Sequence, residues 1–117
     1  MRVGFFDSGL GGLSVLNHAL KILPKEKFLY YADVNNVPYG NKSREDILKY
    51  SEEAIDFLVE KGSKAIVIAC NTATSAGAEV IRQKYPDIPI IGIEPAVKPA
   101  ILKYKTDKRI LLLATNA

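Results

Sequence analysis

Short apolar runs alternate with segments of helical periodicity along most of the chain. Between the runs, apolar residues recur every three or four positions, as at Leu13, Leu16 and Leu20, which predicts helices. The resulting βαβαβαβαβ order predicts an α/β fold, a Rossmann-like parallel sheet with helices on both faces in three αβα layers. The runs that predict its strands occupy positions 3–6, 28–32, 65–69, 89–93 and 110–113.

Cap and turn residues bound the predicted helices. Pro24 ends the first helix, because proline cannot continue it. Ser43 and Asp46 form a variant of the capping box at the start of the second helix, and Gly62 ends that helix. One face of the second helix is apolar and predicts core positions at Ile47, Ala54, Ile55 and Leu58.

Polar residues follow the predicted strands. Right-handed crossovers between parallel strands bring all strand carboxyl ends to one edge of the sheet. Open α/β sheets bind their ligands at that edge. We therefore expect a ligand site near the residues that follow the strands, which are Asp7, Asp33, Cys70 and Glu94.

The glycine-rich turn Asp7-Ser8-Gly9-Leu10-Gly11-Gly12 joins the first strand to the first helix. Backbone N–H groups at a helix start attract an anion. The turn matches only half of a dinucleotide fingerprint, because Ser14 takes the third glycine position. Asp7 would also repel a pyrophosphate, so a small zwitterion fits better, with its ammonium at Asp7. A tight turn capped by Asp7 or Ser8 is the structural alternative.

Cys70 stands between the third strand and the following helix. The start of a helix favours a reactive thiolate, but a lone cysteine after an apolar strand can equally be a small buried hydrophobe. Asn71 and Thr72 add donors that can hold a substrate carboxylate beside the thiol. His18 is the only histidine and lies mid-helix, which argues against a Cys-His protease and against a structural zinc site.

Composition narrows the function classes. The 117 residues suffice for one small domain, and 48% hydrophobic with 25% charged residues argues against disorder. The net charge is +3, but the lysines are dispersed without interleaved aromatics, so we expect no nucleic-acid partner. No apolar stretch approaches the roughly 20 residues of a membrane span. Asp7 precedes any signal-peptide core, and the single cysteine suits a reducing compartment, so we expect a cytoplasmic protein without membrane partners.

Three motifs in register resemble the glutamate racemase family across essentially the whole chain. They are residues 7–13, Val37-Pro38-Tyr39-Gly40 and Ala69-Cys70-Asn71-Thr72-Ala73, with Gly92-Ile93-Glu94-Pro95 as a further landmark. The resemblance implies an isomerase that interconverts L- and D-glutamate without pyridoxal phosphate, a metal or another cofactor. Its implied role is to supply D-glutamate for peptidoglycan, and thereby to support cell-wall biogenesis and cell shape.

The resemblance also implies roles for individual residues. Cys70 matches one of two opposed catalytic cysteines, of which one removes the α-proton and the other returns a proton. Asp7 matches a substrate contact that also assists proton transfer. The other implied contacts to glutamate are Ser8, Tyr39, Gly40, Asn71 and Thr72.

The chain departs from the family pattern in three respects. The loop 33–37 reads Asp-Val-Asn-Asn-Val, where the family usually has Ser-Ala-Arg before the Val-Pro-Tyr-Gly motif. The second cysteine, in a downstream Cys-Thr-His motif, is absent. The family has two α/β domains, so we expect residues 1–97 to form a first domain that lacks its C-terminal completion. Residues 98–117 then begin the second domain.

These departures predict that the chain alone does not racemise glutamate. Family members often form homodimers, which implies the same here by analogy. Two alternatives stay open at this point: a stand-alone binding module for an amino acid or small anion, with an inert Cys70, and a racemase for aspartate.

Overall fold

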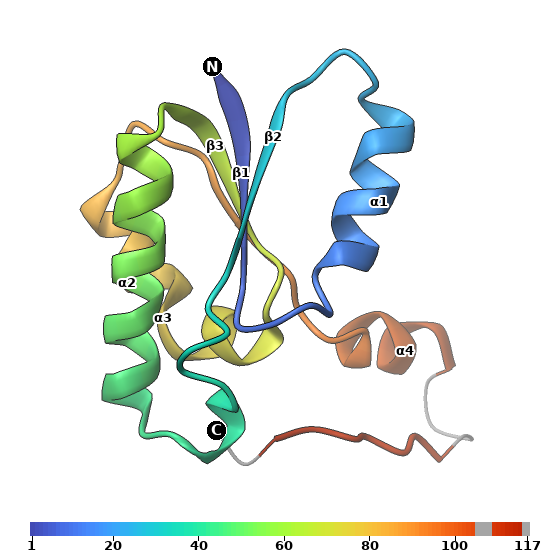
Figure 1. Cartoon of the computed structure of the whole chain (residues 1–117). Coiled ribbons are helices and arrows are strands. Elements are labelled where there is room, and N and C mark those ends of the chain that lie inside the picture. The colour runs from blue at the N-terminus through green and yellow to red at the C-terminus, as the bar shows by residue number, and fades with distance from the viewer. Residues whose placement is uncertain (105–108, 116–117) are drawn as a thin grey trace.

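The computed structural model describes residues 1–104 and 109–115, and it confirms the predicted α/β fold (Figure 1). Within this part of the chain, four parallel strands pair in the order β2-β1-β3-β4. The strands are β1 (Arg2–Asp7), β2 (Phe28–Ala32), β3 (Ser63–Ile68) and β4 (Ile90–Gly92). The helices are α1 (Leu13–Ile22), the 3-10 turn η1 (Tyr39–Asn41), α2 (Arg44–Glu60), α3 (Asn71–Lys84) and α4 (Val97–Tyr104).

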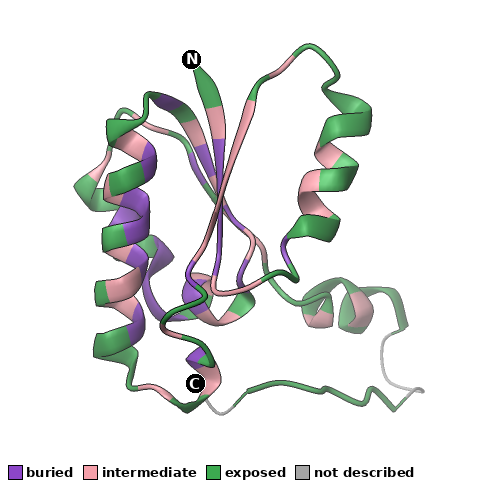
Figure 2. Cartoon of the chain, in the orientation of Figure 1, coloured by how far each residue is buried: buried purple, intermediate pink, exposed green. Residues whose placement is uncertain are grey.

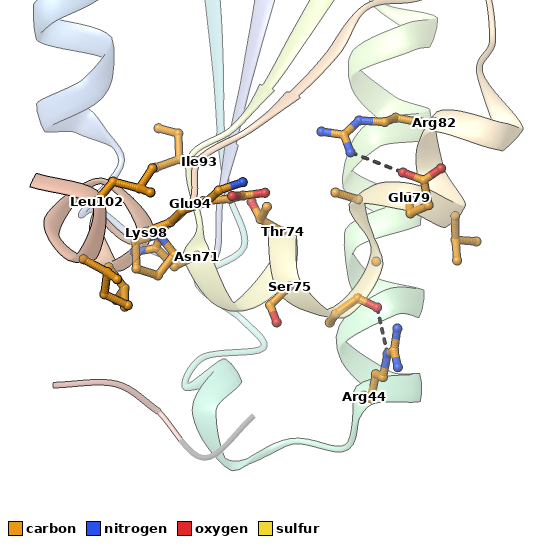
Figure 3. Close-up of a pocket in the computed structure, with 17 residues that line it drawn as sticks. Arg44, Asn71, Thr74, Ser75, Glu79, Arg82, Ile93, Glu94, Lys98 and Leu102 are labelled. Atoms are coloured by element: carbon orange, nitrogen blue, oxygen red, sulfur yellow. Dashed lines mark hydrogen bonds and ion pairs between the residues drawn. The ribbon is translucent and has the colours of Figure 1, made fainter. Parts of the chain in front are cut away.

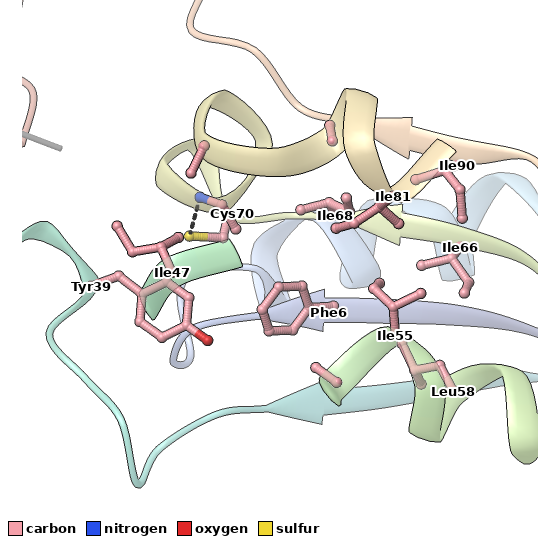
Figure 4. Packing of buried hydrophobic residues seen from close by; sticks show 14 residues of the cluster. Phe6, Tyr39, Ile47, Ile55, Leu58, Ile66, Ile68, Cys70, Ile81 and Ile90 are labelled. Atoms are coloured by element: carbon pink, nitrogen blue, oxygen red, sulfur yellow. Dashed lines mark hydrogen bonds between the residues drawn. The ribbon is translucent and has the colours of Figure 1, made fainter. Parts of the chain in front are cut away.

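The hydrophobic core lies between the sheet and the helices α2 and α3 (Figures 2 and 4). Phe6 of β1 and the alternate residues Ile66 and Ile68 of β3 point into this layer and are fully buried. Removing these side chains from water stabilises each by about 1.5–3 kcal/mol. The predicted core face of α2 is confirmed, since its four apolar residues have no exposed surface: Ile47, Ala54, Ile55 and Leu58.

The opposite face of the sheet is less covered. Helix α1 lies on that side (Figure 1), but none of its residues is buried, and Leu13 and Leu20 are 42% and 48% exposed. In β3, Ala65 and Val67 are only half-buried, in contrast to the isoleucines that alternate with them. Helices therefore flank both faces, as expected, but the larger buried core lies on the α2/α3 side, and Phe5 is the buried hydrophobic residue of β1 on the α1 side.

The predicted cap of α2 is present. The backbone N–H of Asp46 donates to Ser43 Oγ at 3.1 Å, and Ser43 Oγ donates to the Asp46 carboxylate at 2.8 Å. Gly62 ends the helix with φ +78°, a conformation that an L side chain adopts only at a cost. The two caps fix where α2 starts and where the chain turns into β3.

Strand register brings the strand ends to one edge of the sheet. Phe6 pairs with Tyr31 and Ile68, and Asp7 pairs with Ala32. Hydrogen bonds extend this pairing past the strands, because the Asp33 N–H donates to the Asp7 carbonyl at 3.0 Å. The residues that follow β1, β2 and β3 are consequently neighbours, as the sequence predicted.

The predicted fifth strand at 110–113 is wrong. These residues form no strand, and Leu111 and Leu113 are 85% and 86% exposed. The segment runs past the strand ends instead of along a sheet edge (Figure 1), so its backbone groups have no ladder to join. No helix in the described ranges is long and apolar enough to cross a membrane.

The uneven burial predicts different costs for the same substitution. Leu58→Ala should lower the free energy of unfolding by about 2–5 kcal/mol, because it leaves a cavity in the α2 core. Leu20→Ala on the exposed side of α1 should cost less than about 1 kcal/mol. Urea unfolding followed by circular dichroism measures both, and equal losses would contradict the one-sided core.

Candidate functional site

Asp7 closes the glycine-rich turn between β1 and α1. Its Oδ2 accepts the backbone N–H of Gly12 at 2.9 Å, and its side chain is only 6% exposed. A side chain on Gly12 would collide with Asp7, Ala69 and Tyr30, which explains the glycine there. Asp7 therefore caps the turn, as the structural alternative predicted. Asp7 also lines a cavity.

Cys70 occupies the N-cap of α3. Its backbone is extended (φ −96°, ψ 117°), and its Sγ accepts the Ala73 N–H at 3.4 Å (Figure 4). Ser8 Oγ lies 3.4 Å from the same sulfur. The side chain is 6% exposed, so Cys70 is largely buried, and two hydrogen-bonding groups at the start of α3 and in the glycine-rich turn contact its sulfur. Such donors stabilise a thiolate.

A cavity of about 810 Å³ opens where these two turns meet. The glycine-rich turn that begins with Asp7 lines one side of the cavity, and the start of α3 lines the other. The predicted site residues that line it are Asp7, Cys70, Asn71 and Thr72. Ser8 joins this group through its contact with the Cys70 sulfur.

Tyr39 belongs to the core rather than to the cavity wall. Its hydroxyl donates to Asp33 Oδ2 at 2.7 Å, and its ring is 3% exposed beside Ile47 (Figure 4). The Asn36 amide donates to both oxygens of Asp33 at 2.9 and 3.0 Å. Burial, followed by the hydrogen bond and charge of Asp33, raises the pKa of Tyr39 well above its usual range. The hydroxyl therefore anchors the loop, and neither Tyr39 nor Gly40 lines the cavity of Asp7 and Cys70.

Tyr30 is a site residue that the sequence reasoning missed. Its hydroxyl donates to the Gly9 carbonyl at 3.0 Å and lies 3.4 Å from Asp7 Oδ2. Burial and then the Asp7 charge raise the pKa of Tyr30 to about 12. The parallel register of β1 and β2 could have indicated this residue. Tyr30 pairs with Phe5, two positions before Asp7, so Tyr30 and Asp7 project from the same face of the sheet.

The segment 109–115 adds a second contact that was not foreseen. Thr115 Oγ1 lies 3.2 Å from Thr72 Oγ1, and a Cβ built on Gly40 would meet the Thr115 side chain at 2.7 Å. Leu112 and Leu113 line the same cavity. This segment, which was expected to be a strand and turn, therefore connects the Gly40 loop with the start of α3.

A neighbouring groove of about 620 Å³ lies between α3 and α4 (Figure 3). Glu94 and Lys98 line it, so Glu94 follows its strand as expected but does not face Asp7 or the Cys70 cavity. Two arginines of the groove are engaged by α3 itself: Arg44 donates to the Ala76 carbonyl at 3.0 Å, and Arg82 pairs with Glu79 at 3.4 Å.

The Cys70 cavity combines groups of complementary chemistry. Asp7 offers a negative charge to an ammonium, and the backbone N–H groups at the start of α3 suit a carboxylate. Cys70 lines the same cavity, and its Sγ is a group that can accept or donate a proton. The described residues hold no cluster of three or more His, Cys, Asp or Glu side chains that suits a metal ion, and His18 is exposed on α1.

The sequence profile of the Asp/Glu/Hydantoin racemase family matches residues 12–117. A glutamate racemase of Clostridium perfringens is 57% identical over 115 residues, which is 98% of this chain and 44% of that protein. The chain therefore spans less than half of the length of this relative.

Solved structures agree with the sequence matches. The glutamate racemase of Aquifex pyrophilus has a TM-score of 0.81 and 42% identity, over 90% of this chain and 42% of that one. The glutamate racemase of Francisella tularensis in complex with D-glutamate has a TM-score of 0.74 and 38% identity. That match covers 78% of this chain and 35% of the Francisella chain.

The raised pKa of Tyr30 predicts a loss of stability at high pH. Its folded pKa of about 12 exceeds the ordinary value of 10.0. The stabilisation is therefore fully present below about pH 10 and is lost as the pH rises through about 12. Tyr30→Phe should cost about 1 kcal/mol at about pH 9, and this cost should vanish or reverse near pH 12. Urea unfolding across this range tests the sign, and a pH-independent cost would contradict it.

The Asp33–Tyr39 pair predicts energetic coupling within the loop. Tyr39→Phe should lower the free energy of unfolding by about 1–3 kcal/mol, because it leaves a buried carboxylate short of one donor. Asp33→Asn should cost less once Tyr39 is already Phe. A double-mutant cycle from urea unfolding measures the coupling, for which we expect about 1 kcal/mol or more. Strictly additive losses would show that the hydrogen bond does not hold the loop.

Proposed function

Because the chain belongs to the Asp/Glu/Hydantoin racemase family, we propose that it forms the part of a glutamate racemase that carries one of two catalytic thiols. The observation that carries this proposal is the shared cavity of Cys70 and Asp7, with the thiol at the start of α3. Glutamate is the proposed substrate because the similar Francisella protein was solved with D-glutamate.

In the proposed reaction, the substrate ammonium lies at Asp7 and its α-carboxylate at the N–H groups of Asn71 and Thr72. The Cys70 thiolate removes the α-proton, so the Cα–H bond breaks and an S–H bond forms. The electron pair stays on Cα and is delocalised into the carboxylate. A second thiol then delivers a proton to the opposite face of Cα. Each step needs the thiol in line with Cα, which fixed donors around the sulfur favour.

Ser8, Tyr39 and Gly40 have supporting roles in this proposal. Ser8 Oγ, at 3.4 Å from Cys70 Sγ, is placed to donate to the thiolate before substrate arrives. Tyr39 fixes the loop through Asp33, so that the Gly40 backbone is available to the substrate. We assign the contact with the substrate to the Gly40 backbone rather than to the Tyr39 hydroxyl, because that hydroxyl already donates a hydrogen bond to Asp33.

We also propose that residues 1–97 belong to a first domain and residues 98–117 to the start of a second. In support, α4 contains no buried residue, and the described residues 109–115 are all exposed. Residues 105–108 and 116–117 lie outside the described residues.

The cellular setting is part of the proposal. The product, D-glutamate, would serve peptidoglycan synthesis. A free catalytic thiol suits the reducing cytoplasm. The homodimer implied by the resemblance stays a prediction, which analytical ultracentrifugation of the complete gene product would test.

Racemisation by the complete gene product tests the function. Without added pyridoxal phosphate, it should convert L- to D-glutamate, and Cys70→Ala should lower kcat by about 10²- to 10⁴-fold. Residues 1–117 alone should not racemise, because their one thiol reaches one face of Cα. Chiral chromatography of the products measures both, and Cys70→Ser is the isosteric comparison.

Three results would redirect the assignment. Retained activity in Cys70→Ala would remove the thiol from the mechanism. Turnover of aspartate in preference to glutamate would favour the aspartate racemase. Binding of an amino acid without turnover, with Cys70 intact, would favour a binding module.

A further inference from the structure

Tyr30 is partly buried beside the candidate site, and its hydroxyl has no role in the reaction proposed above. It projects from β2 toward the glycine-rich turn, and its hydroxyl oxygen lies within 3.4 Å of the Asp7 carboxylate. The neighbouring Tyr31 projects to the opposite face, where its ring packs against Phe6 and Phe57. The two tyrosines thus share a strand and a side-chain type but not an environment.

The Tyr30 hydroxyl joins the two halves of the turn. One proton serves two acceptors, of which the Gly9 carbonyl at 3.0 Å is closer than Asp7 Oδ2 at 3.4 Å. The same Asp7 oxygen accepts the Gly12 N–H at 2.9 Å. Two donors from different elements therefore fix this oxygen, and the Tyr30 hydroxyl limits how far Asp7 can rotate toward the cavity.

Close packing leaves this arrangement little freedom. A Cβ on Gly12 would lie 2.9 Å from the Tyr30 hydroxyl and 2.9 Å from Asp7 Cβ. The hydroxyl is therefore in contact with the turn itself. A phenylalanine in place of Tyr30 would fill the same space as the tyrosine ring but would supply no hydrogen-bond donor. Packing alone therefore does not account for the hydroxyl.

We propose that Tyr30 is a positioning residue for the proton transfer at Cys70, which acts by holding the Asp7 carboxylate and the Gly9 carbonyl in place. This inference rests on the proposed racemase function. Without the hydroxyl, Asp7 gains rotational freedom and its charge is less compensated. Its negative potential at the Cys70 sulfur then rises, which disfavours the thiolate.

The effect should be confined to the half-reaction of Cys70. In the complete gene product, Tyr30→Phe should lower kcat about tenfold while KM changes less than about twofold. Tyr31→Phe is the matched control and should leave both within about twofold. Both are conservative changes, and circular dichroism confirms that the variants fold.

Isotope effects separate positioning from a general loss of structure. With α-deuterated glutamate, Tyr30→Phe slows the step at Cys70 only. The deuterium isotope effect on kcat should therefore rise for the enantiomer whose proton Cys70 removes, and fall for the other. Equal changes for both enantiomers, or none, would overturn the proposal, as would the same response in Tyr31→Phe.

A second readout does not require turnover. Alkylation of Cys70 by iodoacetamide, followed by mass spectrometry of its peptide, should be about two- to threefold slower in Tyr30→Phe than in wild type or Tyr31→Phe. If the gene product does not racemise but this difference appears, Tyr30 still holds Asp7 beside the thiol, whereas the proposed reaction and a role of Tyr30 in proton transfer both fail. If the gene product racemises glutamate and the alkylation rates are equal, the proposed function stands and the positioning role of Tyr30 is contradicted.

Discussion

The parallel register of β1 between β2 and β3 is the constraint on which the site depends. Phe6 pairs with both Tyr31 and Ile68, so the three strands end level with one another. Asp7 at the end of β1, Asp33 after β2 and Cys70 just past β3 are consequently brought to one edge from distant parts of the sequence. A shift of one residue would turn Phe6 out of the α2/α3 core and would move Asp7 to the other face. Core packing and the position of the carboxylate are therefore fixed together.

Two residues at this edge have a structural role and, in the proposed function, a chemical one. Asp7 closes the turn before α1 through the Gly12 N–H, and Cys70 accepts the Ala73 N–H at the start of α3. A cap needs a polar acceptor at the end of a strand and the start of a helix. The proposed reaction needs a carboxylate and a thiol at the same place. The structural and chemical explanations of these residues are thus compatible, and a capping role does not argue against a catalytic one.

The sequence predicted what local patterns and chain order control. The α2 core face, the Ser43 cap and the shared edge of the strand ends follow from periodicity, cap chemistry and parallel topology. It did not predict the Asp33–Tyr39 hydrogen bond, because the conformation of a polar loop depends on contacts across the chain. It did not predict Tyr30, because the place of this side chain beside Asp7 depends on the pairing register of β1 and β2 and not on a local pattern. The strand expected at 110–113 failed because an apolar run forms a strand only where a partner strand is available.

The geometry of the cavity also sets what the described residues can do. The thiol and the carboxylate come from neighbouring turns on one side, and the exposed segment 112–115 lines the cavity together with them. The chain holds one cysteine, and in the proposed reaction its sulfur approaches the substrate Cα from one side. Inversion requires that a proton leave one face and that another arrive at the opposite face. In the proposed reaction, the second acid must therefore reach the substrate Cα from the side opposite Cys70, which the groups beside the thiol do not supply.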